Sequence, residues 1–221
     1  MKLVEAVTFQ MGSTTGDSDE APVHSVTISK DYYIGETEVT QALWEAVTGY
    51  SPTSDGRSWS TEYGLGDNYP AYYISYEDVQ SFITKLNSLT GENFRMPTEA
   101  EWEFAARGGN KSKGYTYSGS NTIGDVAWYD DNSSMTHTVK TKAANELGIY
   151  DMSGNVWEWC SDWYGTYGSS AQTDPTGPTT GTYRVFRGGG WNFIATYCRC
   201  ADRHFNTPSD RFDGLGVRLA L

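Results

Sequence analysis

The chain has few basic residues and no long apolar run, and each shortage excludes a class of protein. Only 16 of its 221 residues are Lys or Arg against 28 Asp or Glu, which gives a net charge of −12 at pH 7. A nucleic-acid-binding protein needs a basic surface to displace counterions, so no nucleic-acid partner is expected. No apolar run reaches the ~20 residues that span a bilayer. The first residues, "MKLVEAVTFQMG", lack the features of a signal peptide.

Cysteine and histidine are also scarce. Cys160, Cys198 and Cys200 are too few, and odd in number, for a disulfide scaffold. Three buried thiols are expected, and a single bridge from Cys160 to either of the others stays open as the alternative. Cys198 and Cys200 form a C-x-C pair that suits a soft-metal site or a packed core. The three histidines lie far apart, which argues against a histidine metal centre.

Helix signals are concentrated in the first half of the chain. The residues expected to cap and to follow three helices are Thr40 and Gly49, Ser75 and Gly91, and Thr98 and Gly108. Apolar residues recur at helical spacing in the first two, which places Leu43 and Leu89 on buried faces. Three carboxylates, Glu99, Glu101 and Glu103, fall at the start of the third helix. The helix dipole favours acids there, so we expect them to be solvated.

Strand signals are concentrated in the second half. Gly, Ser, Thr, Asn and Asp separate the short aromatic runs "DVAWYD", "NVWEWCSDWY" and "TYRVFRGGGW", which predict short strands joined by long loops. Near the start, "HSVTISKDYYIG" alternates in the manner of a strand. Early helices with irregular later strands predict one α+β domain over residues 1–221.

The motif "YDMSGNVWEWCSDWY" supports two interpretations. Asp151 and Glu158 flank a glycine turn and offer hard oxygen ligands beside backbone carbonyls, the set that calcium prefers. Alternatively, Trp157 and Trp159 belong to the core and Glu158 pairs internally with an arginine. Spacing alone does not separate these two interpretations.

A local shortage distinguishes residues 193–214, "FIATYCRCADRHFNTPSDRFDG". These 22 positions hold five aromatic or imidazole rings, three Arg and three Asp, but no Lys, Glu, Gln, Met or Trp. Those five types make up 37 of the 221 residues, so their joint absence is not expected by chance. The segment is rich in side chains that bind ligands, and the absence of five amino-acid types from it requires an explanation.

Five motifs in order resemble the formylglycine-generating-enzyme, or sulfatase-modifying-factor, family. They are "PVHSVTISKDYYIGETEVTQALWEAV", "FRMPTEAEWEFAARGG", "NELGIYDMSGNVWEWCSDWY", "YRVFRGGGWN" and "GVRLAL". The resemblance covers nearly the whole chain and implies a C-type-lectin-like fold with little regular structure. It also implies a structural calcium site, with side-chain oxygens from Asp151 and Glu158 and main-chain carbonyls from Gly154 and Val156. No other cofactor is expected.

Oxidases of this family bind copper through two cysteines in a pattern like RGGS-(F/W)-x-C-x-x-x-x-C. The second cysteine matches Cys198, but Phe193 stands at the position of the first. A phenyl ring cannot replace a thiolate, and Cys200 lies on the wrong side of Cys198 to substitute. The sequence therefore predicts a family member that is not an enzyme, with an oxidase of altered metal ligands as the alternative.

A second branch of the resemblance comprises variable proteins of diversity-generating retroelements. Their C-terminal segment, here 183–221, is rewritten at adenines, typically in AAC or AAT codons. Because the third base stays a pyrimidine, Lys, Glu, Gln, Met and Trp cannot arise there, which accounts for the local shortage. The implied variable positions are Phe193, Ile194, Tyr197, Asp202, His204, Phe205, Asn206, Asp210, Phe212, Asp213 and Gly214.

The resemblance thus implies a receptor-like protein with a diversified C-terminal binding face. Rings combined with Asp and Asn suit such a face, since they give rigid contact area and adaptable polar groups. The expected partner is a protein or carbohydrate ligand, bound by a monomer at the cell surface or outside the cell. A noncatalytic binding module without diversification is the remaining alternative.

Overall fold

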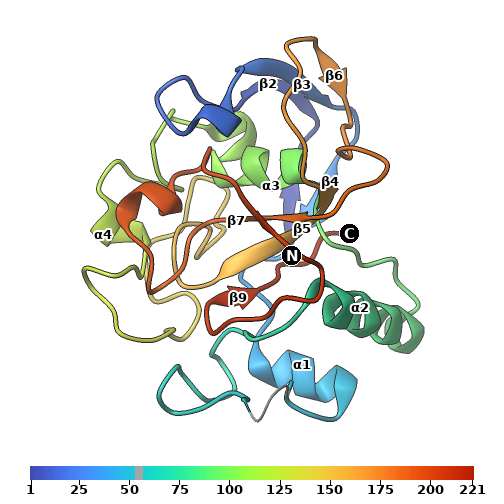
Figure 1. Ribbon diagram of the computed structural model, residues 1–221, viewed down its shortest axis with the longest axis vertical. Coiled ribbons are helices and arrows are strands. Elements are labelled where there is room, and N and C mark those ends of the chain that lie inside the picture. The colour runs from blue at the N-terminus through green and yellow to red at the C-terminus, as the bar shows by residue number, and fades with distance from the viewer. Residues whose placement is uncertain (53–56) are drawn as a thin grey trace.

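Three small sheets carry the strands of the computed structural model, which describes residues 1–52 and 57–221 (Figure 1). In the first, β1 (Lys2–Val4) pairs with β4 (Tyr32–Ile34). The second has the order β2 (Val7–Met11), β3 (His24–Ile28), β6 (Gln172–Thr173). The third, which bears on function, has the order β8 (His204–Asn206), β7 (Arg184–Arg187), β5 (Trp157–Trp163), β9 (Leu215–Gly216).

The three predicted helices are present with their predicted caps. They are α1 (Gln41–Thr48), α2 (Tyr76–Thr90) and α3 (Glu99–Ala106). The hydroxyls of Thr40, Ser75 and Thr98 each accept a hydrogen bond from the backbone N–H three residues on, which satisfies a donor that the helix leaves free. The described residues also form four shorter helical segments: η1 (Ser18–Glu20), η2 (Gly109–Lys111), α4 (Ile123–Val126) and η3 (Ala195–Cys198).

Two strand predictions need correction. The run "HSVTISKDYYIG" forms two strands, β3 and β4, which belong to different sheets. The run "DVAWYD" forms no strand, because its start belongs to α4 and the rest has tertiary partners. The Trp128 ring stacks on His137 at 3.7 Å, and the Trp128 carbonyl accepts from Asn155 N at 2.8 Å. The aromatic runs of β5 and β7 are strands, as predicted.

One core cluster lies between the third sheet and the helices α1 and α2, and another surrounds α3. Trp157 and Trp159 are fully buried, and Trp44 of α1 stacks on Phe82 of α2 with 4.7 Å between ring centroids. Leu43 and Leu89 were expected on buried faces but are 39% and 69% exposed. They sit at the margins of their apolar stripes, beyond the contact between the two helices.

Helix α3 is buried on all sides, and this overturns one prediction. Glu99, Glu101 and Glu103 were expected to be solvated, yet they are 4%, 9% and 0% exposed. The helix is in contact with β2, β3, β5 and β7, so its first turn faces protein instead of water. Each carboxylate has an arginine partner, since a buried charge is tolerated only when it is paired.

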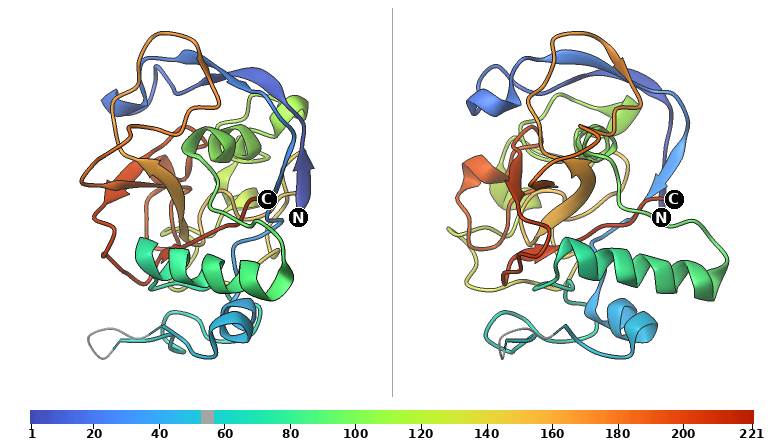
Figure 2. Two further views of the ribbon diagram at one scale, coloured as in Figure 1. Left: turned by 90° about the vertical axis from the view of Figure 1, so that its right-hand side faces the viewer. Right: turned by 45° about the vertical axis from the view of Figure 1, so that its right-hand side comes forward.

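The two ends of the chain lie close together beside β4 (Figure 2). Tyr33 exchanges backbone hydrogen bonds of 3.0 and 2.8 Å with Leu221, while β1 pairs with the other edge of the same strand. Both edges of β4 are therefore occupied. Among the helices of the described residues, none has the length and apolarity needed to cross a membrane.

Candidate functional site: a C-terminal loop with two aromatic patches

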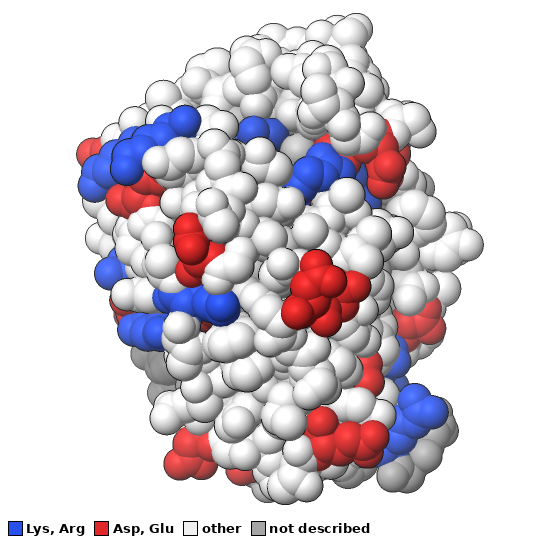
Figure 3. Space-filling view, turned by 90° about the vertical axis from the view of Figure 1, so that its left-hand side faces the viewer, with Lys and Arg blue, Asp and Glu red and all other residues white. Residues whose placement is uncertain are grey.

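Residues 193–214 form one continuous surface segment beside the third sheet. The segment runs through η3, then the edge strand β8, and then a loop that leads into β9 (Figure 1). The face that carries η3 and α4 is mostly uncharged, with acidic and basic side chains in a few separate groups (Figure 3). A surface of this kind suits contact through rings and neutral polar groups.

Four predicted variable rings gather around one framework tryptophan. The Trp157 ring centroid lies 5.4 Å from that of Phe193, 6.3 Å from Tyr197 and 5.0 Å from His204. Phe212 joins through Phe193, at 6.3 Å. All four are partly exposed, so each presents one side to solvent and packs the other on the core. We call these four residues the first patch.

Phe205 lies apart from the first patch. Because side chains alternate along a strand, Phe205 points to the opposite face of β8 from His204. Its ring is 4.0 Å from Tyr164 and 5.1 Å from Tyr183, and it is 39% exposed. We call Phe205, Tyr164 and Tyr183 the second patch. Sequence reasoning missed Tyr164 as a candidate, since it lies far from the segment in sequence.

The remaining predicted variable positions differ in exposure. Ile194 is 52% exposed, and Asn206, Asp210 and Asp213 are partly exposed. Asp213 borders a hollow of about 530 Å³ whose aromatic walls come from outside the segment. These walls are Trp59, Tyr63, Tyr72 and Tyr73. No sequence signal marked them, because only the fold brings them to the segment.

Two predicted ligand-binding positions are buried, which corrects the prediction for them. Gly214 is covered by the framework, and its carbonyl accepts from Trp157 N at 2.7 Å. Asp202 is 1% exposed. Carboxylate oxygens of Asp17, Glu20 and Asp202 lie within 4.8 Å of one another, and the Arg199 guanidinium bonds to both Glu20 and Asp202. Neither Asp202 nor Gly214 is placed to touch a ligand.

Burial of Asp202 leads to a pH prediction. Burial, opposed by Arg187 and Arg199 and reinforced by Glu20 and Asp17, raises the pKa of Asp202 to about 8. In the unfolded chain the Asp202 carboxyl has a pKa of about 3.9. Between that pKa and the folded pKa of about 8, the carboxyl is protonated in the folded protein but not in the unfolded chain, so stability falls as the pH rises through this range. Asp202→Asn should therefore raise the melting temperature more at pH 8.5 than at pH 5. An equal shift at both pH values, judged against the exposed control Asp67→Asn, would contradict this.

The predicted variable side chains share one property. Across residues 1–52 and 57–221, no side chain at the eleven positions forms a hydrogen bond or ion pair with a residue outside 193–214. The segment is instead attached to the rest of the protein by hydrogen bonds of its backbone and by side chains at positions not predicted to vary. For example, Tyr73 N donates to Phe212 O at 3.1 Å, and Ser153 Oγ donates to Cys198 O at 2.7 Å.

The three cysteines are buried free thiols, as expected. Burial raises the pKa of Cys200 to about 12 and raises the pKa of Cys198 further above its ordinary range. Thiolates are the metal ligands and nucleophiles, so both groups are held in their inert form. Among the described residues, no cysteine joins a cluster with the spacing of a metal site.

Glu158 has the contacts of an internal ion pair. Its carboxylate accepts from Arg218 Nη2 at 2.7 Å and Arg218 Nε at 3.0 Å, and from Trp102 Nε1 at 2.6 Å. These three donors occupy the oxygens that calcium would need, so Glu158 does not fit the implied ligand set. Burial raises the pKa of Asp151 to about 6, and its Oδ2 accepts from Lys140 N at 2.8 Å. The implied calcium site at Asp151, Gly154, Val156 and Glu158 stays a prediction, and the contacts of Glu158 argue against it; elemental analysis of the purified protein checks it.

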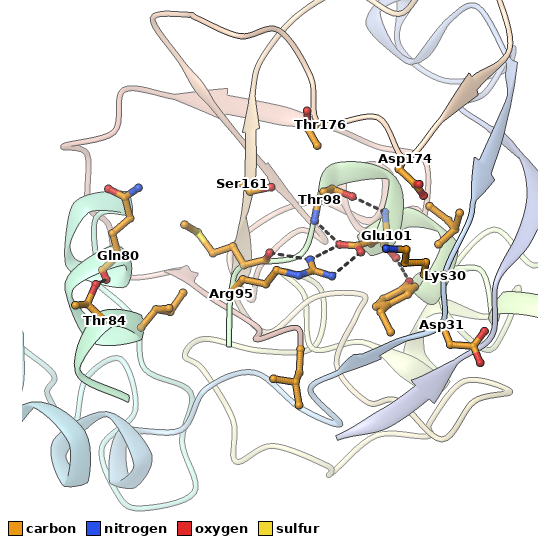
Figure 4. Close-up of a pocket in the computed structure, with 15 residues that line it drawn as sticks. Lys30, Asp31, Gln80, Thr84, Arg95, Thr98, Glu101, Ser161, Asp174 and Thr176 are labelled. Atoms are coloured by element: carbon orange, nitrogen blue, oxygen red, sulfur yellow. Dashed lines mark hydrogen bonds and ion pairs between the residues drawn. The ribbon is translucent and has the colours of Figure 1, made fainter. Parts of the chain in front are cut away.

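A hollow of about 790 Å³ lies away from residues 193–214. It is lined by α2, the start of α3, the loop after β6, the turn between β3 and β4, and Leu221, and by none of the eleven predicted variable positions (Figure 4). Arg95 crosses its floor and binds Glu101 with two hydrogen bonds, of 2.6 and 2.7 Å. The hollow is therefore separate from the predicted variable positions.

The chain matches the family model described as the sulfatase-modifying factor enzyme 1-like domain over residues 1–221. It belongs to this family. The formylglycine-generating enzyme of Streptomyces coelicolor is 31% identical over 276 residues, with 96% of this chain and 86% of that protein covered. Chaperone protein LppX of Paenibacillus barcinonensis is 34% identical over 233 residues, with 86% and 77% covered.

Among solved structures of this fold, Treponema denticola variable protein 1 superimposes with a TM-score of 0.88. The two are 34% identical, and 100% of this chain and 94% of that chain are covered. This confirms the predicted α+β, C-type-lectin-like fold of the sulfatase-modifying-factor family, and the resemblance to variable proteins within it.

Proposed function

We propose that this chain is a ligand-binding protein whose C-terminal segment, 183–221, is diversified by a retroelement, and that it is not an enzyme. The observation that carries the proposal is that, within residues 193–214, the residues on the surface differ from the residues that attach the segment to the fold. The predicted variable positions supply the exposed and partly exposed rings, yet within residues 1–52 and 57–221 their side chains form no hydrogen bond or ion pair with a residue outside 193–214. A surface that is to be rewritten requires that folding does not depend on its side chains.

The two patches define where the ligand would bind. Ile194 and the first patch offer apolar and aromatic area with an imidazole, and the second patch adds Phe205 beside Tyr164 and Tyr183. Aromatic side chains give large contact areas at low entropic cost. The ligand is a protein or carbohydrate, bound by a monomer at the cell surface or outside the cell. Asn206, Asp210 and Asp213 would tune its recognition.

The competing function is cysteine oxidation, since the Streptomyces coelicolor relative is a formylglycine-generating enzyme. Phe193 stands where the oxidase pattern has its first cysteine, and burial disfavours the Cys198 thiolate. Incubated with a cysteine-containing sulfatase peptide and copper, the protein should form no aldehyde by mass spectrometry. Copper-dependent conversion of cysteine to aldehyde would replace the binding function with an oxidase.

Diversification is tested in DNA. The gene should be accompanied by a reverse transcriptase gene and by a near-copy of its 3′ end that differs only at adenines. The differences should fall in the codons of the variable positions and spare those of Arg199, Arg203 and Arg211. If no such copy exists, the chain is a binding module without diversification.

A further inference from the structure

Three arginines interrupt the variable segment, and all three bind acids in the same way. Arg199, Arg203 and Arg211 are the arginines of residues 193–214, and none is a predicted variable position. Each uses two guanidinium nitrogens to bind both oxygens of one carboxylate far away in the chain. Variable positions fall between successive arginines, so the anchors divide the segment into short spans.

The three acids belong to three different elements, each in the first turn of a helix. Arg199 binds Glu20 of η1, with Nη1 at 2.9 Å and Nη2 at 2.5 Å. Arg203 binds Glu99 of α3 through Nε and Nη2, both at 2.7 Å. Arg211 binds Asp78 of α2, with Nε at 2.8 Å and Nη2 at 3.0 Å.

The acids are themselves held in place. Asp78 Oδ2 accepts from Ser75 N at 2.9 Å, which completes the cap of α2. Glu20 Oε1 accepts from Asp17 N at 2.9 Å, and Glu99 Oε1 accepts from Tyr167 OH at 2.9 Å. Two parallel hydrogen bonds from a guanidinium to a fixed carboxylate set both the distance and the orientation of the arginine. A lysine ammonium sets only the distance.

We infer that Arg199, Arg203 and Arg211 are positioning residues that fix the path of the variable segment whatever side chains occupy the positions between them. This inference rests on the proposed function and deepens it. Arg199 directly follows η3, Arg203 directly precedes β8, and Arg211 lies in the loop before β9, so the segment is tied to a different helix start at each of these points. The variable side chains are then free to change without moving the backbone that presents them.

Arg211 offers the cleanest test. The Arg211 and Asp78 side chains are 26% and 31% exposed, so removing the cation leaves Asp78 in contact with water. Glu20 and Glu99 are buried, and loss of Arg199 or Arg203 would leave an unpaired buried charge that destabilises the whole fold. The variant is therefore Arg211→Gln.

The chain supplies a matched control in Arg95→Gln. Arg95 also binds an acid of a helix first turn through two nitrogens, at Glu101 of α3, and the two side chains are 42% and 12% exposed. This pair lies outside the variable segment (Figure 4). Arg95→Gln removes the same kind of ion pair without touching residues 193–214, and because Glu101 is more buried than Asp78, peptides from β5 report any loss of global stability.

The readout is amide hydrogen exchange followed by mass spectrometry on the full chain. In Arg211→Gln, exchange at residues 207–214 should accelerate about tenfold while peptides from β5 and α3 keep their wild-type rates, because local opening is separable from global unfolding. In Arg211→Lys, the exchange rate at residues 207–214 should lie between those of the wild type and Arg211→Gln, because lysine restores the positive charge but not the two parallel hydrogen bonds. Arg95→Gln should leave residues 207–214 unchanged.

A second comparison tests indifference to side chains. With all three arginines present, the combined change Ile194→Asn, Tyr197→Asn, Phe205→Asn should leave exchange at residues 207–214 at the wild-type rate. Unaltered exchange in Arg211→Gln, or equal acceleration in Arg95→Gln, would overturn the inference, as would loosening by the triple change alone. Absence of the template copy in DNA would overturn the proposed function and leave these exchange results as they are.

Discussion

Replacing Trp157 by alanine should lower the free energy of unfolding by about 3–5 kcal/mol, the usual cost of removing a large buried ring and leaving a cavity. Trp157 is fully buried. The rings of Phe186, Phe193, Tyr197 and His204 pack around it, with 5.0 Å between the ring centroids of Trp157 and Phe186. It therefore supports the first patch from below. Urea unfolding followed by circular dichroism measures the change, and the unfolding slope should stay constant.

Phe205→Ala is the matched comparison, because it also removes an aromatic ring from the same region. Phe205 is 39% exposed and rests on Tyr164, so its loss should cost only about 0.5 kcal/mol, as for other surface changes. Phe193 and Phe212 are half-buried against the core and should fall between the two. If Phe205→Ala costs as much as Trp157→Ala, Phe205 is part of the core and the second patch is not a binding surface.

Replacing Arg218 by methionine should destabilise the protein by about 3–5 kcal/mol, because it leaves a buried carboxylate without its cation. Both Arg218 and Glu158 are fully buried, and the guanidinium also donates to the carbonyls of Gly35 and Tyr150 at 2.8 Å. Burial, reinforced by the charges of Asp151 and Glu158, raises the pKa of Glu38 well above its ordinary value, and Arg218 opposes that shift. Arg218 thus offsets the negative charge of three buried acids, Glu38, Asp151 and Glu158.

The double change Arg218→Met, Glu158→Gln separates the charge from the packing. Removing both charges should recover part of the stability lost in Arg218→Met, since the unpaired anion is the larger cost. Both variants are compared by thermal unfolding at pH 7. A double variant less stable than Arg218→Met would show that the hydrogen bonds of Glu158 to Trp102, and not its charge, dominate at this site.

Several features follow from the sequence because they depend on neighbours a few residues away. The caps at Thr40, Ser75 and Thr98 are hydrogen bonds within one turn of chain, so their residue types alone predict them. The family, and with it the fold, follows from ordered motifs along residues 1–221. The candidate variable positions remain a prediction from the resemblance to retroelement variable proteins, whose codon rule applies to single residues.

Other features depend on partners that are distant in sequence, and only the tertiary structure decided them. Glu99 meets Arg203 across 104 residues, so the helix signal around Glu99 could not distinguish a buried ion pair from a solvated acid. Asp202 and Phe205 belong to the same stretch of codons, yet packing buries one and exposes the other. Exposure depends on which segments the fold places against a residue, whereas local sequence determines only the hydrogen bonds and periodicity available near it.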